Sequence, residues 1–143
     1  DYSPIFAPVR DYIQAADLAY VKEETHLGGD DIGPKGYPSF NTTDQMADAS
    51  WRRALTSWGR SNHAYDWGYF GANDHSRAVW NEQPVAFAGT ASSAEEAEKI
   101  ATVERNGITF ALLDYTYGVN GYDQDDLPDY AVSFMDKDRI EPT

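Results

Sequence analysis

The apolar positions at the start of the chain recur at the spacing of an α-helix. Ser3 followed by Pro4 is typical of a helix start, because serine caps the free amides and proline fits the first helical position. One face of such a helix collects the apolar residues Ile5, Val9, Ile13, Ala16 and Tyr20. The pattern predicts a first helix from Ser3 to about Glu24.

A second helix is predicted after an irregular loop. Residues 30–40 are rich in glycine and proline, which favours a loop. Thr42 and Gln45 then form a capping box. One face of this helix collects the apolar residues Ala47, Trp51, Leu55 and Trp58. Gly59 ends the pattern.

The helical periodicity fails over residues 63–80, which predicts a loop or short strands there. Residues 84–90 are predicted as a strand. A helix should begin at the capping boxes of Ser92 and Ser93 and end at Asn106-Gly107. Residues 108–117 follow as a strand whose apolar run indicates burial on both faces.

Strand, helix and strand with short connections predict one βαβ-like unit over residues 84–117. Residues 130–135 alternate weakly enough to be a last strand. The chain of 143 residues is long enough for one core, so residues 1–143 are expected to form a single domain. The predicted class is α+β, with two N-terminal helices packed on a mixed sheet, and α/β is the alternative.

Charge narrows the set of partners. The net charge of −13, from 24 acidic against 11 basic residues, disfavours nucleic acid and anionic membrane surfaces. A polar small molecule, a glycan or a basic protein surface remains. No apolar run approaches the length that spans a bilayer, and the acidic, cysteine-free composition predicts a secreted or periplasmic protein.

An aspartate-rich stretch is the most unusual local feature. Its carboxylates are Asp123, Asp125, Asp126 and Asp129. The stretch fails the EF-hand pattern, because Pro128 stands where glycine is needed and Phe134 where the bidentate glutamate belongs. It is therefore either an irregular calcium site or a solvated acidic loop, and calcium is the one cofactor that the sequence suggests.

Asp114 is the first candidate catalytic carboxylate. It directly follows an apolar run, so partial burial would suit it to general acid chemistry with Asp66, Asp123 or His63 as its partner. At the end of a central parallel strand it would also lie where α/β sheets place ligands. The alternative is an aspartate that only caps a turn.

The histidines form a second candidate site. His63, Asp66, Asp74 and His75 are close in the sequence. A folded-back loop could unite them as a cation site, or one histidine and one aspartate could form an acid/base pair. Packed or surface histidines are the structural alternative. Trp67, Tyr117, Trp80 and His75 are the expected substrate contacts, although large aromatic residues are often simply part of a core.

Two classes of function fit these features. One is a small hydrolase or lyase that acts on a polar, glycan-like substrate by carboxylate acid/base chemistry. The other is a non-catalytic module or accessory subunit that binds carbohydrate, calcium or a protein. The sequence has neither a glycine-rich phosphate loop with its lysine nor a Gly-x-Ser-x-Gly motif, and whether the chain is an enzyme stays open at this level.

Overall fold

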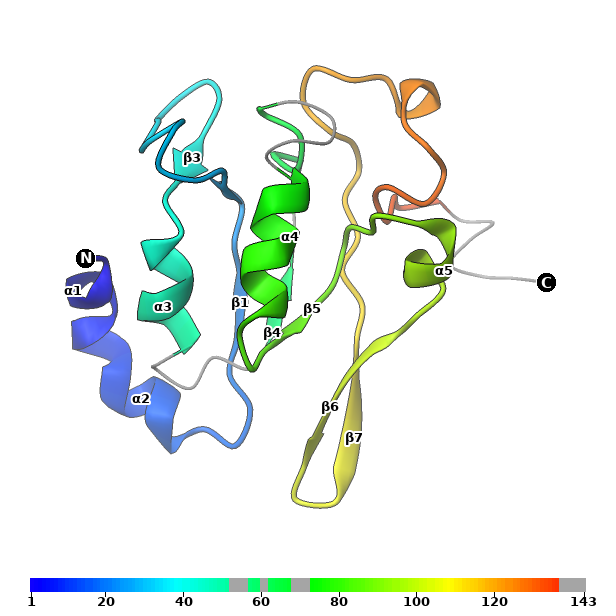
Figure 1. Cartoon of the computed structure of the whole chain (residues 1–143). Coiled ribbons are helices and arrows are strands. Elements are labelled where there is room, and N and C mark those ends of the chain that lie inside the picture. The colour runs from blue at the N-terminus through cyan, green and yellow to red at the C-terminus, as the bar shows by residue number, and fades with distance from the viewer. Residues whose placement is uncertain (52–56, 60–61, 68–72, 137–143) are drawn as a thin grey trace.

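The computed structural model describes residues 1–51, 57–59, 62–67 and 73–136. It confirms the α+β class, because helices accompany both parallel and antiparallel strand pairs. In Figure 1, helix α4 lies in front of the small parallel sheet, the N-terminal helices lie to one side, and a β-hairpin extends away from the body. Among the described residues, none of the helices has the length and apolar character needed to cross a bilayer.

The central sheet is parallel and contains β1 (Tyr20–Lys22), β4 (Ser57–Gly59) and β5 (Ala86–Phe87) in that order. Helix α3 (Gln45–Trp51) lies between β1 and β4 in the chain, and α4 (Asn73–Asn81) lies between β4 and β5. Crossover connections therefore build this sheet, as parallel pairing requires. A smaller parallel pair joins β2 (His26–Leu27) to β3 (Asn41–Thr42).

The predicted first helix is right at its start and wrong beyond Ala15. It consists of α1 (Ser3–Phe6), a 3-10 turn η1 (Ala7–Val9) and α2 (Arg10–Ala15). Pro8 lacks an amide hydrogen, which accounts for the tighter turn inside the helical stretch. Residues 20–22 are strand β1 instead, because they pair with residues 57–59 across the sheet.

The predictions for the middle of the chain also need correction. The second helix is confirmed from Gln45 to Trp51, but residues 57–59 form a strand, and Leu55 lies outside the described residues. Residues 62–67 form turns as expected, whereas α4 replaces the predicted loop from Asn73 onward. Helix α4 buries Trp80 and contacts β2. This packing outweighs the weak helical signal of the local sequence.

The prediction of a βαβ-like unit over residues 84–117 is wrong. Helix α5 (Ala94–Ala97) is capped by Ser93 as expected but is short. Strands β6 (Ala101–Arg105) and β7 (Ile108–Leu112) then form an antiparallel hairpin. Asn106 and Gly107 both have positive φ, the conformation of a tight hairpin turn. Most of β7 is consequently exposed, contrary to the prediction that both its faces are buried.

Two apolar clusters form the core. The first centres on Leu27, Ala47 and Trp80 between α3, α4 and β2. Trp80 is 1% exposed and is part of this core, and its role as a substrate contact stays a prediction. The second cluster joins the turn at residues 62–67 to the C-terminal part of the chain: Ala64, Tyr65, Val119, Leu127, Ala131, Val132 and Phe134. This second cluster fixes the position of the turn that carries His63 and Asp66.

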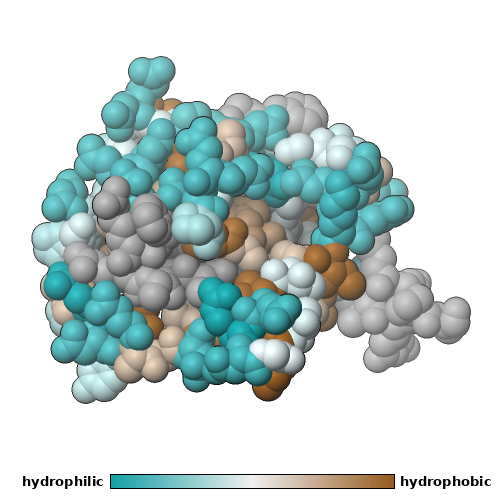
Figure 2. Space-filling model, turned by 60° about the horizontal axis from the view of Figure 1, so that its bottom comes forward, coloured by the Kyte–Doolittle hydropathy of each residue, from teal (hydrophilic) through white to brown (hydrophobic). Residues whose placement is uncertain are grey.

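The last predicted strand is present only as an extended segment. Single bridges join Thr90 to Val132 and Thr116 to Phe134. The segment thus lies between the residues that follow β5 and those that follow β7. On the surface, Figure 2 shows apolar patches among mostly hydrophilic side chains on the face that includes the bottom of the view in Figure 1.

The loop between β2 and β3 offers a stability test at Gly28. The Asn41 side chain accepts a hydrogen bond from the Gly28 amide at 2.8 Å and donates one to the Gly33 carbonyl at 2.8 Å. A methyl group at Gly28 would overlap Asn41 Oδ1 and lie 2.8 Å from Ile32 Cδ1. We expect Gly28→Ala to lower the free energy of unfolding by about 1–3 kcal/mol, measured by urea denaturation.

Gly36→Ala is the matched control for that experiment. A methyl group at Gly36 meets no atom within 4 Å, and its φ is not positive. The control should change the free energy of unfolding by less than about 0.5 kcal/mol. Equal effects of the two substitutions would show that Asn41 does not lock this loop.

Candidate functional site

The turn at residues 62–67 is positioned by its own buried residues. Ala64 and Tyr65 lie in the second apolar cluster, and the Tyr65 ring packs edge to face with Tyr122 at 6.0 Å. The Asp66 amide closes the turn with the His63 carbonyl at 3.4 Å. Burial of the middle of the turn therefore fixes the two polar residues on either side of it.

His63 and Asp66 form a close pair. Nδ1 of His63 lies 2.8 Å from Oδ2 of Asp66, which also accepts a hydrogen bond from the Phe40 amide at 2.9 Å. The Asp66 side chain is 2% exposed and that of His63 16% exposed. A buried carboxylate held by two donors has one fixed orientation, and it fixes the histidine ring in turn.

Phe40, the residue before β3, contacts this pair through its backbone and its ring. The indole Nε1 of Trp67 donates to the Phe40 carbonyl at 3.1 Å, so Trp67 and Asp66 bind the two backbone polar groups of the same residue. The Phe40 and His63 rings pack edge to face, with centroids 4.8 Å apart and planes at 87°. Trp67 stays on the surface beside the pair, at 37% exposure.

Asn120 brings a third segment to the site. Its amide nitrogen donates to the Asn62 carbonyl at 2.8 Å, and its side chain accepts from Asn62 Nδ2 at 3.2 Å. Its own side-chain nitrogen lies 3.2 Å from His63 Nδ1. Neither asparagine was predicted from the sequence, where the only signal is that Asn62 precedes His63 and that Asn120 lies in a glycine-rich turn.

This geometry suits proton transfer. The 2.8 Å contact with a carboxylate favours a proton on His63 Nδ1, because a carboxylate only accepts hydrogen bonds. With that proton in place, the Asn120 side-chain nitrogen, which only donates, is a neighbour of Nδ1 and not its hydrogen-bond partner. In the neutral ring, Nε2 then carries the lone pair. Asp66 also stabilises the imidazolium ion that forms when Nε2 takes a proton.

Asp114 lies in a different environment. It is buried as expected, but it follows a hairpin strand rather than a central parallel strand. Its Oδ1 accepts a hydrogen bond from Lys22 Nζ at 2.7 Å, so its close described partner is a cation rather than Asp66, Asp123 or His63. A neighbouring ammonium group favours the ionised carboxylate, which suits an acceptor better than a general acid.

Asp114 also lines a cavity of about 300 Å³ between α5 and the residues around β5 and β7. The same cavity is bordered by Arg77, Glu96, Tyr115 and Tyr130. His63 and Asp66 do not line it. The structure thus separates the first candidate carboxylate from the second candidate site.

The other predicted residues are divided among several places. His75 Nε2 lies 3.0 Å from Asp44 Oδ1 at the surface, and Asp74 accepts a hydrogen bond from Ser92 at 3.4 Å. Of the four residues predicted as a joint cation site, His63 and Asp66 therefore contact each other, whereas Asp74 and His75 have other partners. Tyr117 is 73% exposed, and its role as a substrate contact stays a prediction.

The aspartate-rich stretch forms a short exposed turn. It contains the 3-10 helix η3 (Gln124–Asp126), whose start is capped by the side chain of Asp123. Within the described ranges, no group of three or more histidine, aspartate or glutamate side chains is arranged to hold a metal ion. Calcium binding by Asp123, Asp125, Asp126 and Asp129 stays a prediction.

Comparisons with known proteins add one match. Residues 1–141 match the family model PGA_cap, which is described as a bacterial capsule synthesis protein. A comparison with curated proteins finds no match. The match covers nearly the whole chain, including both candidate sites.

The Lys22–Asp114 pair influences the pKa of Tyr20, which lies two residues from Lys22. Burial raises the pKa of Tyr20, the Asp114 carboxylate raises it further, and Lys22 opposes both. The folded protein thus binds the phenol proton more tightly than the unfolded chain. This contribution to stability is complete below the pKa of unfolded tyrosine and is lost as pH rises through the folded-state pKa of Tyr20.

Phenolate absorbance during alkaline titration measures this effect. Tyr20→Phe should remove a component that ionises at higher pH than ordinary tyrosine, and Asp114→Asn should move that component to lower pH. Tyr12→Phe, at an exposed position, controls for the loss of one phenol. A Tyr20 component at or below the ordinary value would refute the assigned environment.

Proposed function

The chain belongs to the bacterial capsule synthesis family, and we propose that it is a hydrolase that acts on a capsular glycan or its precursor with His63 as the acid/base group. The observation that carries this proposal is the His63–Asp66 pair, in which a nearly fully buried carboxylate holds Nδ1 of a partly exposed histidine. Capsule chemistry also supports a location outside the cytoplasm. The family match supports the polymer as substrate, and the pair supports the chemistry.

The proposed reaction uses His63 twice. Nε2 takes a proton from a water molecule while the water oxygen attacks the linkage, and the proton then passes to the leaving oxygen as the bond breaks. Asp66 stabilises the imidazolium ion between the two steps and keeps the ring in one orientation. One water molecule is consumed and no other reactant is needed.

His63 is a better acid/base candidate than Asp114 because of the partners of each group. Asp114 is paired with Lys22 at 2.7 Å, which stabilises its charge. His63 instead faces a carboxylate that stabilises its protonated form, so it can accept and return a proton. We therefore assign Asp114 to ligand binding, as argued below.

Aromatic side chains near the pair support a sugar substrate. The Trp67 ring is held by its hydrogen bond to Phe40 and remains partly exposed next to His63. Tyr117 is three residues before Asn120 and is largely exposed. Flat aromatic faces pack against the apolar face of a sugar ring, and such contacts would orient a polymer across the site.

Substitutions of the pair test the proposal on purified capsular polysaccharide. His63→Gln should lower kcat by about 10²- to 10⁴-fold, because the proton-transfer group is lost. Asp66→Asn should lower kcat more than it changes KM, because ring orientation and charge are lost while binding surfaces remain. The readouts are release of new chain ends and shortening of the polymer on size-exclusion chromatography.

Two controls separate chemistry from folding. Asp17→Asn makes the same chemical change at an exposed carboxylate, which accepts a hydrogen bond from Asn106 at 2.9 Å, and should leave kcat unchanged. Added imidazole should partly restore activity to His63→Ala, because the cavity left by the ring can hold it. If His63→Gln folds normally and retains full activity, His63 is not the acid/base group.

A further inference from the structure

We propose that the cavity beside Asp114 is a second binding site and that it takes one neutral saccharide unit. The cavity measures about 300 Å³, which lies at the lower end of the size range of small-molecule pockets. It is bordered by α5 on one side and by residues that follow β5 and β7 on the other. None of its lining residues belongs to the His63–Asp66 pair.

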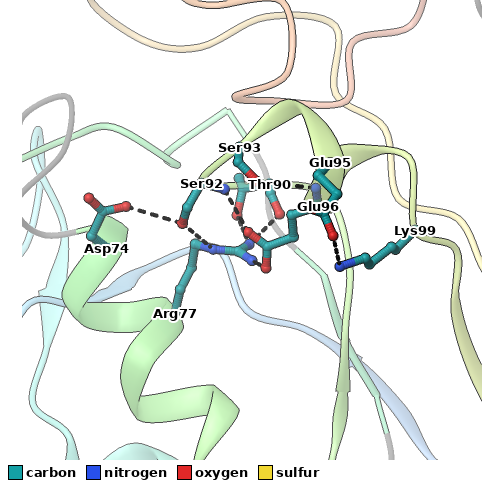
Figure 3. A network of polar contacts seen from close by, with 8 residues as sticks. All are labelled: Asp74, Arg77, Thr90, Ser92, Ser93, Glu95, Glu96 and Lys99. Carbon is teal, nitrogen blue, oxygen red and sulfur yellow. Dashed lines mark hydrogen bonds and ion pairs between the residues drawn. The ribbon is translucent and has the colours of Figure 1, made fainter.

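One wall of the cavity is built by an ion pair whose arginine is buried and whose glutamate is partly exposed. Arg77 extends from α4 toward the start of α5 and pairs with Glu96 (Figure 3). The guanidinium also donates to Ser92 Oγ at 3.1 Å and to Thr90 Oγ1 at 3.2 Å. Its carbon lies 5.5 Å from the centre of the Phe87 ring. Arg77 is therefore fully engaged, and this wall is preformed rather than assembled by the ligand.

The polar groups around the cavity suit hydroxyl groups. Asp114 supplies a buried carboxylate that can accept hydrogen bonds, while Tyr115, Tyr130 and Ser133 supply hydroxyls that donate or accept. A sugar hydroxyl both donates and accepts, so it can satisfy all of these groups. The apolar side chains of Phe87, Leu112 and Ile100 provide contact for the C–H face of a ring.

The charges around the cavity favour a neutral ligand. Arg77 is paired with Glu96, Lys99 with Glu95 at 2.9 Å, and Asp114 with Lys22. Arg77 and Lys22 are each matched by a carboxylate, and water screens the charge of the exposed Lys99–Glu95 pair, so an anionic ligand gains little attraction and meets the Asp114 carboxylate. A cationic ligand would have to replace Lys22 at a buried site.

This site does not depend on the acid/base proposal. A polymer that is cut or built elsewhere on the protein can be held here by one of its units, which raises its local concentration at the reaction site. Binding by the cavity and chemistry by His63 can therefore fail independently. A binding measurement tests the cavity alone.

Nuclear magnetic resonance titration of the full chain provides that test. Glucose, galactose and N-acetylglucosamine are the neutral probes, glucuronic acid is the anionic probe, and glucosamine is the cationic probe. At least one neutral sugar should produce saturable amide shifts at Gly89, Ala97 and Ser133, with a Kd on the order of 1 mM. The two charged sugars should bind more weakly.

A matched pair of substitutions locates the site. Ala94 and Ala97 are both exposed positions of α5, and only Ala97 lines the cavity. Ala97→Trp should weaken sugar binding by about tenfold or more, because the larger side chain fills the space, whereas Ala94→Trp should not. Ala97→Leu and Ala94→Leu repeat the comparison with a smaller change if the tryptophan variant is less stable.

Five results would overturn the proposal. Neutral sugars could fail to saturate by about 50 mM. The shifts could map to residues outside the cavity. The Ala97 variants could bind as the wild type does, or a charged sugar could bind more tightly than the neutral ones. His63→Gln should bind sugar normally, and loss of binding in that variant would assign the shifts to the proposed reaction site and would equally refute a second site.

Discussion

The buried carboxylate of Asp66 is the constraint on which the proposed reaction site depends. It binds the Phe40 amide and the His63 ring at the same time, and so joins the chain before β3 to the turn at residues 62–67. A carboxylate with so little exposure is stable only while both donors stay in place. The apolar packing of Tyr65 and the hydrogen bonds between Asn120 and Asn62 hold the turn that carries His63. In this part of the molecule, the packing of the core thus also sets the geometry of the site.

The sequence predicted the fold class and several boundaries but not the sheet. Local signals that depend on one or two residues succeeded, such as the proline at the first helical turn and the Ser93 cap. Strand β1 was assigned to a helix, because its apolar residues also fit a helical spacing and its partners lie some forty residues away. Asn106-Gly107 ends a helix or turns a hairpin, and only the pairing of β6 with β7 distinguishes the two.

The candidate site was predictable in its residues and not in its grouping. His63 and Asp66 are three residues apart, so a turn was enough to bring them together. Asp114 and Lys22 are separated by most of the chain, and nothing local indicates that they meet. The same limit applies to Trp80, whose burial is set by packing between α3, α4 and β2 rather than by its neighbours in the sequence.

The Arg77 network explains why a cavity persists beside α5 and the hairpin, two elements that have little stability of their own. Helix α5 is a single turn, and a two-stranded hairpin is barely stable alone. Arg77 and Glu96 tie α5 to α4, and the Ser92 amide adds a hydrogen bond to Glu96 at 2.8 Å. The hairpin is held at its base where Asp114 meets Lys22 of β1. The two charge pairs therefore tie the two sides of the cavity, α5 and the base of the hairpin, to α4 and β1.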